Sequence, residues 1–266
     1  GASNTDQITR INRPIFVGTG IPGTEVNLFA RRAGQVLPTP LGKTTVGSDS
    51  RWRFTSPLLA DGEYTIIVTG SSLSGSVLTT QVPGVVQIDT VGPRLRNAWL
   101  NGGLSVVPGT LDVVNFRLSA TYFDDRSGMD PATMRNLSNY QVIQYHFPPP
   151  GRLTPTGVVT SFDTTPDSND PPPAPTANVS AIVQFAGARL GGPSLMVFTI
   201  SDAIRDIAGN PLDGDYRPRF PSGNGEPGGA YSAFQTLNGI GQRRPAQVTA
   251  ALAKFSRRSN PTLPVR

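Results

Sequence analysis

Short apolar stretches whose polarity alternates residue by residue, each ended by Gly or Pro, recur along this chain. In EVNLFARR, for example, Val26, Leu28 and Ala30 share one face, and polar residues separate them. A period of two is the signature of a β-strand with one buried face. About seven such stretches precede residue 92 at a spacing of ~8–12 residues, which is typical of an Ig-like sandwich.

Composition agrees with many short strands joined by tight turns. The 266 residues include 29 Gly and 26 Pro, and only 15% of them are charged, which argues against a helical bundle. The chain has no Cys, so disulfides, thiolate metal sites and Cys nucleophiles are excluded. No apolar run approaches the ~20 residues of a membrane span, so no membrane insertion is expected.

The formal charge of +5 is concentrated near the end of the chain. Residues 239–266 hold six of the 23 basic residues and no acid, so the remainder carries 17 basic and 18 acidic residues, a net of −1. A nearly neutral body argues against nucleic acid as a partner.

These patterns predict an all-β chain of two tandem Ig-like β-sandwiches. A chain of 266 residues is long enough for each sandwich to bury its own core. We expect a disordered N-terminus over residues 1–6, a first domain over 7–92, a second over 93–238, and a basic tail or linker over 239–266. Residues 146–177 contain nine prolines and are interpreted as a long exposed loop inserted into the second domain.

The second domain is expected to open with a strand over residues 94–100. Simple alternation in RLRNAWL places Leu95, Asn97 and Trp99 on one face of that strand.

The first domain resembles a known family. The segments RPIFVGTGIPGTEVNLF, GSDSRWRF, LLADGEYTIIV and VQIDTVGP are similar, in order and spacing, to the bacterial Ig-like repeats of large adhesins and biofilm-associated surface proteins. In that family an acidic turn often follows the Asp-Gly-x-Tyr strand and takes part in calcium sites between repeats. Residues 69–76 hold no acid here, which leaves Asp89, beside the domain boundary, as the candidate ligand and Asp6 as a secondary candidate.

Residues 93–238 resemble the Ig-like domains of surface-layer proteins and long modular exoproteins. The segments FRLS, SGMDPATMRNLSNYQV and RDIAGNPLDG carry this resemblance. Together the two resemblances imply a non-catalytic structural or adhesion module of a bacterial cell-surface or secreted protein, acting as spacer and presentation scaffold. The implied partners are neighbouring domains of the same polypeptide, and a surface glycan or protein ligand.

Oxygen-bearing side chains crowd into residues 204–216, after a predicted strand. Calcium prefers six to eight oxygen ligands of this kind. The candidate ligands here are Asp206, Asn210, Asp213 and Asp215, and three further candidates elsewhere are Asp89, Asp124 and Asp125. The spacing is not that of an EF-hand, so an Asx-type turn with solvated carboxylates is the preferred interpretation, and a structural calcium ion is the alternative. No other cofactor is expected.

Catalysis finds little support in the sequence. His146 is the single histidine, and no G-x-S-x-G motif is present. An accessory carbohydrate-binding module of a secreted enzyme is the alternative function. Its aromatic platform would draw on Tyr122, Phe123, Tyr140, Tyr145 and Phe147, although aromatics at alternating strand positions more often belong to a core.

Overall fold

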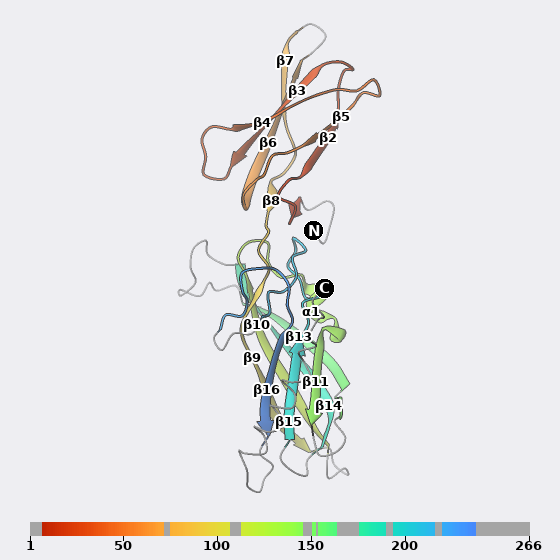
Figure 1. Cartoon of the computed structure of the whole chain (residues 1–266), viewed down its shortest axis with the longest axis vertical. Helices are drawn as coiled ribbons and strands as arrows, with labels where there is room; N and C mark the ends of the chain where they lie inside the picture. Colours follow the sequence, from red (N-terminus) through yellow and green to blue (C-terminus); the bar gives the residue numbers. More distant parts are fainter. Residues whose placement is uncertain are drawn as a thin grey trace, which may run out of the picture.

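The chain folds into two bodies made of β-sheets, which lie end to end along the long axis of the molecule (Figure 1). The computed structural model describes residues 7–71, 75–106, 113–145, 151–152, 154–163, 176–189, 194–215 and 220–237. Strands β1 to β8 form the first body, and strands β9 to β16 form the second.

The first body packs a large sheet against a two-stranded one. The large sheet has the order β1-β8-β6-β3-β4, with β7 also paired to β6, and the small sheet pairs β2 with β5. The bounds are β1 Ile8–Thr9, β2 Ile15–Thr19, β3 Glu25–Arg32, β4 Thr39–Thr45, β5 Arg51–Thr55, β6 Gly62–Ser71, β7 Val77–Gln81 and β8 Val86–Ile88. Leu28, Ile66, Ile88 and Trp52 belong to its core, so the alternation seen in the sequence turns one face of β3, β6, β8 and β5 inward.

The second body is a sandwich of two four-stranded sheets. One sheet has the order β13-β14-β10-β9 and the other the order β12-β11-β15-β16. The bounds are β9 Arg94–Val106, β10 Val113–Asp124, α1 Pro131–Arg135, η1 Leu137–Asn139, β11 Tyr140–Tyr145, β12 Gly151–Arg152, β13 Thr154–Asp163, β14 Thr176–Arg189, β15 Ser194–Ile200 and β16 Tyr231–Leu237. The core between the sheets includes Leu118, Tyr122, Tyr140 and Ile200. The predicted all-β, sandwich-type fold class is confirmed.

The interpretation of residues 146–177 as one exposed loop needs correction. This segment contains β12 and β13, and β13 pairs along its length with β14 at the edge of a sheet. An edge strand accepts proline because one row of its backbone groups is unpaired, and the register shifts between Pro155 and Gly157, where a proline interrupts the ladder. Residues 146–150 and 164–175, with the other prolines of the segment, lie outside the described residues.

The side chains of β9 also depart from simple alternation. Leu95 pairs with Tyr122 and Asn97 pairs with Thr121, so β9 holds one extra residue, Arg96, between them. This β-bulge reverses the orientation of the residues that follow. Leu95 and Leu100 are buried, whereas Trp99 is 43% exposed instead of sharing the face of Leu95.

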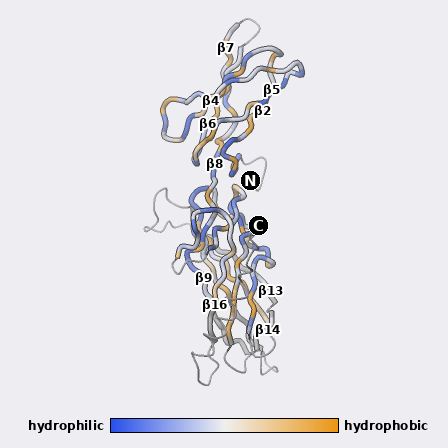
Figure 2. The backbone as a smooth tube through the Cα atoms, viewed as in Figure 1, coloured by the Kyte–Doolittle hydropathy of each residue, from blue (hydrophilic) through white to orange (hydrophobic). Residues whose placement is uncertain are grey.

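Hydropathy follows this architecture. Hydrophobic residues occur along the strands of the second body, and hydrophilic stretches gather in the loops where the two bodies meet (Figure 2). The junction, where the candidate site lies, is therefore one of the hydrophilic regions of the chain.

Candidate metal centre at the junction of the two bodies

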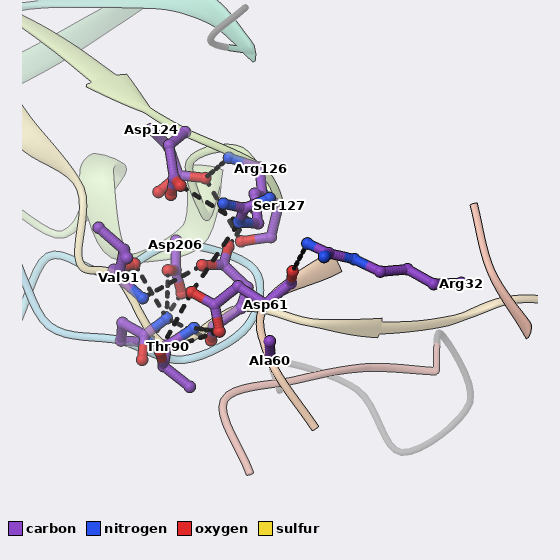
Figure 3. A network of polar contacts seen from close by, with 12 residues as sticks. Arg32, Ala60, Asp61, Thr90, Val91, Asp124, Arg126, Ser127 and Asp206 are labelled. Atoms are coloured by element: carbon purple, nitrogen blue, oxygen red, sulfur yellow. Dashed lines mark hydrogen bonds and ion pairs between the residues drawn. The ribbon is translucent and has the colours of Figure 1, made fainter. Parts of the chain in front are cut away.

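Three buried carboxylates from three separate segments converge between the bodies. Asp89 follows β8 at the end of the first body, Asp124 ends β10, and Asp206 lies in the loop after β15. One oxygen from each carboxylate lies within 4.8 Å of the other two, and the three residues are at most 1% exposed. Figure 3 shows Asp124 and Asp206 turned towards the same space, with Asp61 nearby.

Loop N–H groups orient two of these carboxylates. Oδ2 of Asp124 accepts hydrogen bonds from the backbone N–H groups of Gly128 at 2.7 Å and Arg126 at 3.1 Å. Oδ2 of Asp89 accepts one from the backbone N–H of Ser127 at 3.0 Å. The loop that follows β10 thus folds around its own aspartate and also binds the aspartate of the first body.

Asn210 links the third carboxylate to the same junction. Its backbone N–H and its Nδ2 each donate to the Asp206 carboxylate at 2.7 Å. The same Nδ2 lies 2.9 Å from the carbonyl oxygen of Asp89 and 3.1 Å from that of Val91. One buried amide therefore joins the loop of the second body to the last residues of the first.

More acidic groups surround this triad. Asp61 accepts a hydrogen bond from Oγ1 of Thr90 at 2.9 Å. Nε of Arg126 lies 3.2 Å from Oδ2 of Asp125 and 3.9 Å from Oδ2 of Asp61, so one guanidinium serves two carboxylates at the rim. Oδ1 of Asp125 is shielded from solvent and accepts no hydrogen bond within the described part of the chain.

Burial of like charges raises the affinity of the triad for protons. Desolvation raises the pKa of Asp124 to about 7, with a smaller contribution from the negative charges of Asp89 and Asp206. Desolvation likewise raises the pKa of Asp206 to about 7, although the hydrogen bonds from Asn210 oppose it. The pKa of Asp89 is also raised, mainly by burial. At neutral pH the cluster therefore favours a bound proton or a bound cation that neutralises it.

The donor set fits a hard divalent cation. Ligand oxygens lie about 2.4 Å from Ca²⁺, so any two of them on one ion are at most ~4.8 Å apart. The oxygens of Asp89, Asp124 and Asp206 meet this limit, and each is an anionic ligand once its carboxyl group has lost its proton. Mg²⁺ requires a tighter octahedral arrangement and retains most of its water, so a set of protein carboxylates suits Ca²⁺ better.

The two remaining residues of the predicted cluster lie elsewhere. Asp213 is buried, and its two carboxylate oxygens accept backbone hydrogen bonds from Asn224 and Gly225, each at 2.9 Å. The carboxylate of Asp215 accepts a hydrogen bond from Nδ2 of Asn224. The fold thus divides the acidic segment: Asp206 and Asn210 face the junction, while Asp213 and Asp215 hold the glycine-rich loop that contains residues 222–229.

Sequence reasoning missed Asp61 and Ser127 as parts of the junction. Asp61 precedes Gly62, and an Asp-Gly pair indicates a turn without requiring any further contact. An isolated serine carries no signal for such a contact. The single histidine, His146, lies outside the described residues, as do the N-terminal residues 1–6 and the tail over 239–266.

Comparison with known families supports the domain type of the first body. Residues 1–90 match the family model described as a bacterial Ig-like domain. No curated protein showed a significant match to the chain. Among the described residues, the only helices are short, and none has the length and apolar character needed to span a bilayer. The first body is therefore an Ig-like domain, a type that fits a non-catalytic structural module.

Proposed function

We propose that this chain is a spacer and presentation module of a bacterial cell-surface or secreted protein, with its two bodies held end to end by calcium. The Ig-like domain over residues 1–90 supports a structural role, and such domains are often found on extracellular proteins. Neighbouring domains of the same polypeptide are its expected partners. The resemblance of residues 93–238 to surface-layer Ig-like domains agrees with this role and remains a prediction.

The observation that carries this proposal is the buried triad at the junction. Asp89 belongs to the first body, and Asp124 and Asp206 belong to the second. A cation shared by these three side chains would bind the two bodies at once, so its binding energy would oppose any bending between them. Asp61 and Asp125 at the rim would add negative charge that attracts the cation.

A titration of the full chain with CaCl₂ tests this role. After removal of divalent ions, we expect calorimetric titration to give one site per chain, with a Kd on the order of 10⁻⁴–10⁻³ M, the range of extracellular calcium modules. Calcium at 100 times Kd should stabilise the protein by about 2.7 kcal/mol. Small-angle scattering should show a narrower distribution of overall dimensions when calcium is present.

Matched variants separate this site from general charge effects. Asp206→Asn removes an anionic ligand of the triad and should abolish the calcium heat and the gain in Tm. Asp202→Asn changes an exposed acid four residues earlier and should leave both unchanged. If wild-type protein gives neither heat nor a Tm shift in millimolar calcium, the calcium-locked junction is wrong, and the triad holds protons instead.

The alternative of a carbohydrate-binding module loses most of its predicted platform. Tyr122 and Tyr140 are fully buried in the core of the second body, and the Phe123 ring is covered by arginine side chains. Tyr145 is only half-buried, and Phe147 lies outside the described residues. A different aromatic residue, Trp99, is exposed and could contact a glycan ligand.

A further inference from the structure

The sheet β13-β14-β10-β9 has one face that is not covered by the second sheet. In β10, Leu118, Ala120 and Tyr122 are buried in the core, so the residues between them point outward. The same holds for β14, where Val179 and Ala181 are buried. We call the resulting surface the outer face; it comprises Arg94, Arg96, Asn97 and Trp99 of β9, Arg117, Ser119, Thr121 and Phe123 of β10, and Asn178, Ser180, Ile182 and Gln184 of β14.

Trp99 is the most prominent side chain of the outer face. It is 43% exposed, and the bulge at Arg96 is what turns it outward. Across the sheet it pairs with Ser119, which in turn pairs with Ile182 on β14. Because serine is small, no bulky neighbour in this row covers the indole ring. β-bulges often redirect a side chain beside a binding site, and this one exposes a large aromatic ring on a flat sheet.

The outer face is also cationic. The guanidinium groups of Arg94 and Arg96 lie 5.6 Å and 4.7 Å from the centre of the Phe123 ring, which holds both charges against the sheet. Nε of Arg96 donates a hydrogen bond to Oδ1 of Asn178 at 2.6 Å, which fixes it further. Arg117 is exposed, and its register partners are Asn101 and Gln184. The neighbouring edge strand β13 adds one acid in register with this face, Asp163 opposite Asn178, against the three arginines Arg94, Arg96 and Arg117.

We propose that the outer face binds an acidic polysaccharide, with a sugar ring stacked on Trp99 and an acid group of the polymer paired with the exposed Arg117. The exposed indole offers a flat apolar surface to the C–H groups of a pyranose ring. A guanidinium pairs with a carboxylate or sulfate through two parallel hydrogen bonds, which a neutral sugar lacks. The open face of a sheet suits a polymer that spans several of its rows and binds through repeated weak contacts. This inference goes beyond the spacer role and does not depend on calcium.

Binding of the full chain to immobilised polygalacturonate tests the proposal. Measurements at about 0.15 M ionic strength limit unspecific attraction to the basic residues after 239. We expect Trp99→Ala and Arg117→Gln each to weaken binding by roughly ten-fold. The matched controls Phe234→Ala, an aromatic residue of the other sheet that is 55% exposed, and Arg53→Gln, an exposed arginine of the first body, should bind as wild type.

Further ligands define the chemical class. Dextran sulfate should bind with the same dependence on Trp99 and Arg117, and neutral dextran should not bind. Dextran sulfate, which calcium does not cross-link, should bind equally in CaCl₂ and in EGTA, which keeps a failure here separate from a failure of the calcium junction. Equal binding to neutral dextran, or equal losses in variants and controls, would overturn the proposal. Duplex DNA that binds as tightly, with the same loss in Trp99→Ala, would also overturn it in favour of a general polyanion surface.

Discussion

Replacement of Asn210 by alanine is the sharpest test of how the two bodies are joined. The side chain is 2% exposed, and its Nδ2 lies within 3.1 Å of three acceptors: the carbonyl oxygens of Asp89 and Val91 and the carboxylate of Asp206. A hydrogen bond to a charged group contributes about 1.5–3 kcal/mol and a neutral one about 0.5–1.5 kcal/mol. The side-chain amide has only two N–H protons, so it makes at most one charged and one neutral hydrogen bond of full strength to these three acceptors. We therefore expect Asn210→Ala to lower the free energy of unfolding by roughly 2–4 kcal/mol.

Calorimetry without calcium measures this loss as a decrease in Tm of roughly 5–12 °C for the second body. The loss should be larger at pH 8 than at pH 5, since protonation of Asp206, whose pKa is about 7, weakens its need for a donor at the lower pH. Asn224→Ala is the matched control, because Asn224 also donates to a carboxylate, that of Asp215, but is exposed. A change below about 1 kcal/mol for Asn210→Ala at both pH values would refute the inference that this amide couples the bodies.

Two further predictions concern pH and packing. In calcium-free buffer the folded-state pKa of Asp124 and of Asp206 is about 7, above the ordinary value of 3.8. The bound protons therefore stabilise the folded state fully below about pH 4, and this stabilisation is lost as the pH rises through 7. Wild type should therefore lose more Tm than Asp124→Asn between pH 5 and pH 8, and equal losses would contradict this. Gly18→Ala places a Cβ 2.5 Å from the Trp52 ring and should cost about 1–3 kcal/mol in urea unfolding, whereas Gly70→Ala, with its nearest atom at 3.8 Å, should be nearly neutral.

Strand faces could be predicted where a strand carries no extra residue of its own. The alternation of Val26, Leu28 and Ala30 in the sequence corresponds to three buried side chains, because the register shift between β3 and β4 places the extra residue on β4. The orientation of Trp99 could not be predicted, because the bulge before it depends on how Thr121 and Tyr122 pair with β9 across the sheet. A single extra residue turns every side chain that follows it to the opposite face of the sheet. The position of that residue depends on the partner strand, which the local sequence does not identify.

The junction was predictable in part for a similar reason. Asp206 and Asn210 are four residues apart, so their pairing is local and a crowded polar turn indicates it. The position of Asp89 and Asp124 beside Asp206 depends on how the two bodies pack against each other. The backbone N–H of Asp213 donates to the carbonyl oxygen of Pro93, and this contact directs the later part of the segment away from the triad. Composition identifies such candidates, but only tertiary contacts divide them between sites.

The stability of a junction built from buried carboxylates depends on a bound positive charge, whereas the stability of an apolar junction does not. Removing Asp89, Asp124 and Asp206 from water costs free energy, and their mutual repulsion adds to it, so they stabilise contact between the bodies only when a positive charge is supplied. Protons supply it at low pH, since two of the three pKa values are about 7. At neutral pH the proposed calcium would supply it, and an affinity on the order of 10⁻⁴–10⁻³ M would fill the site only where calcium is plentiful, as it is outside cells. Under that proposal the two bodies would move more freely where calcium is scarce and would become a rigid spacer after export.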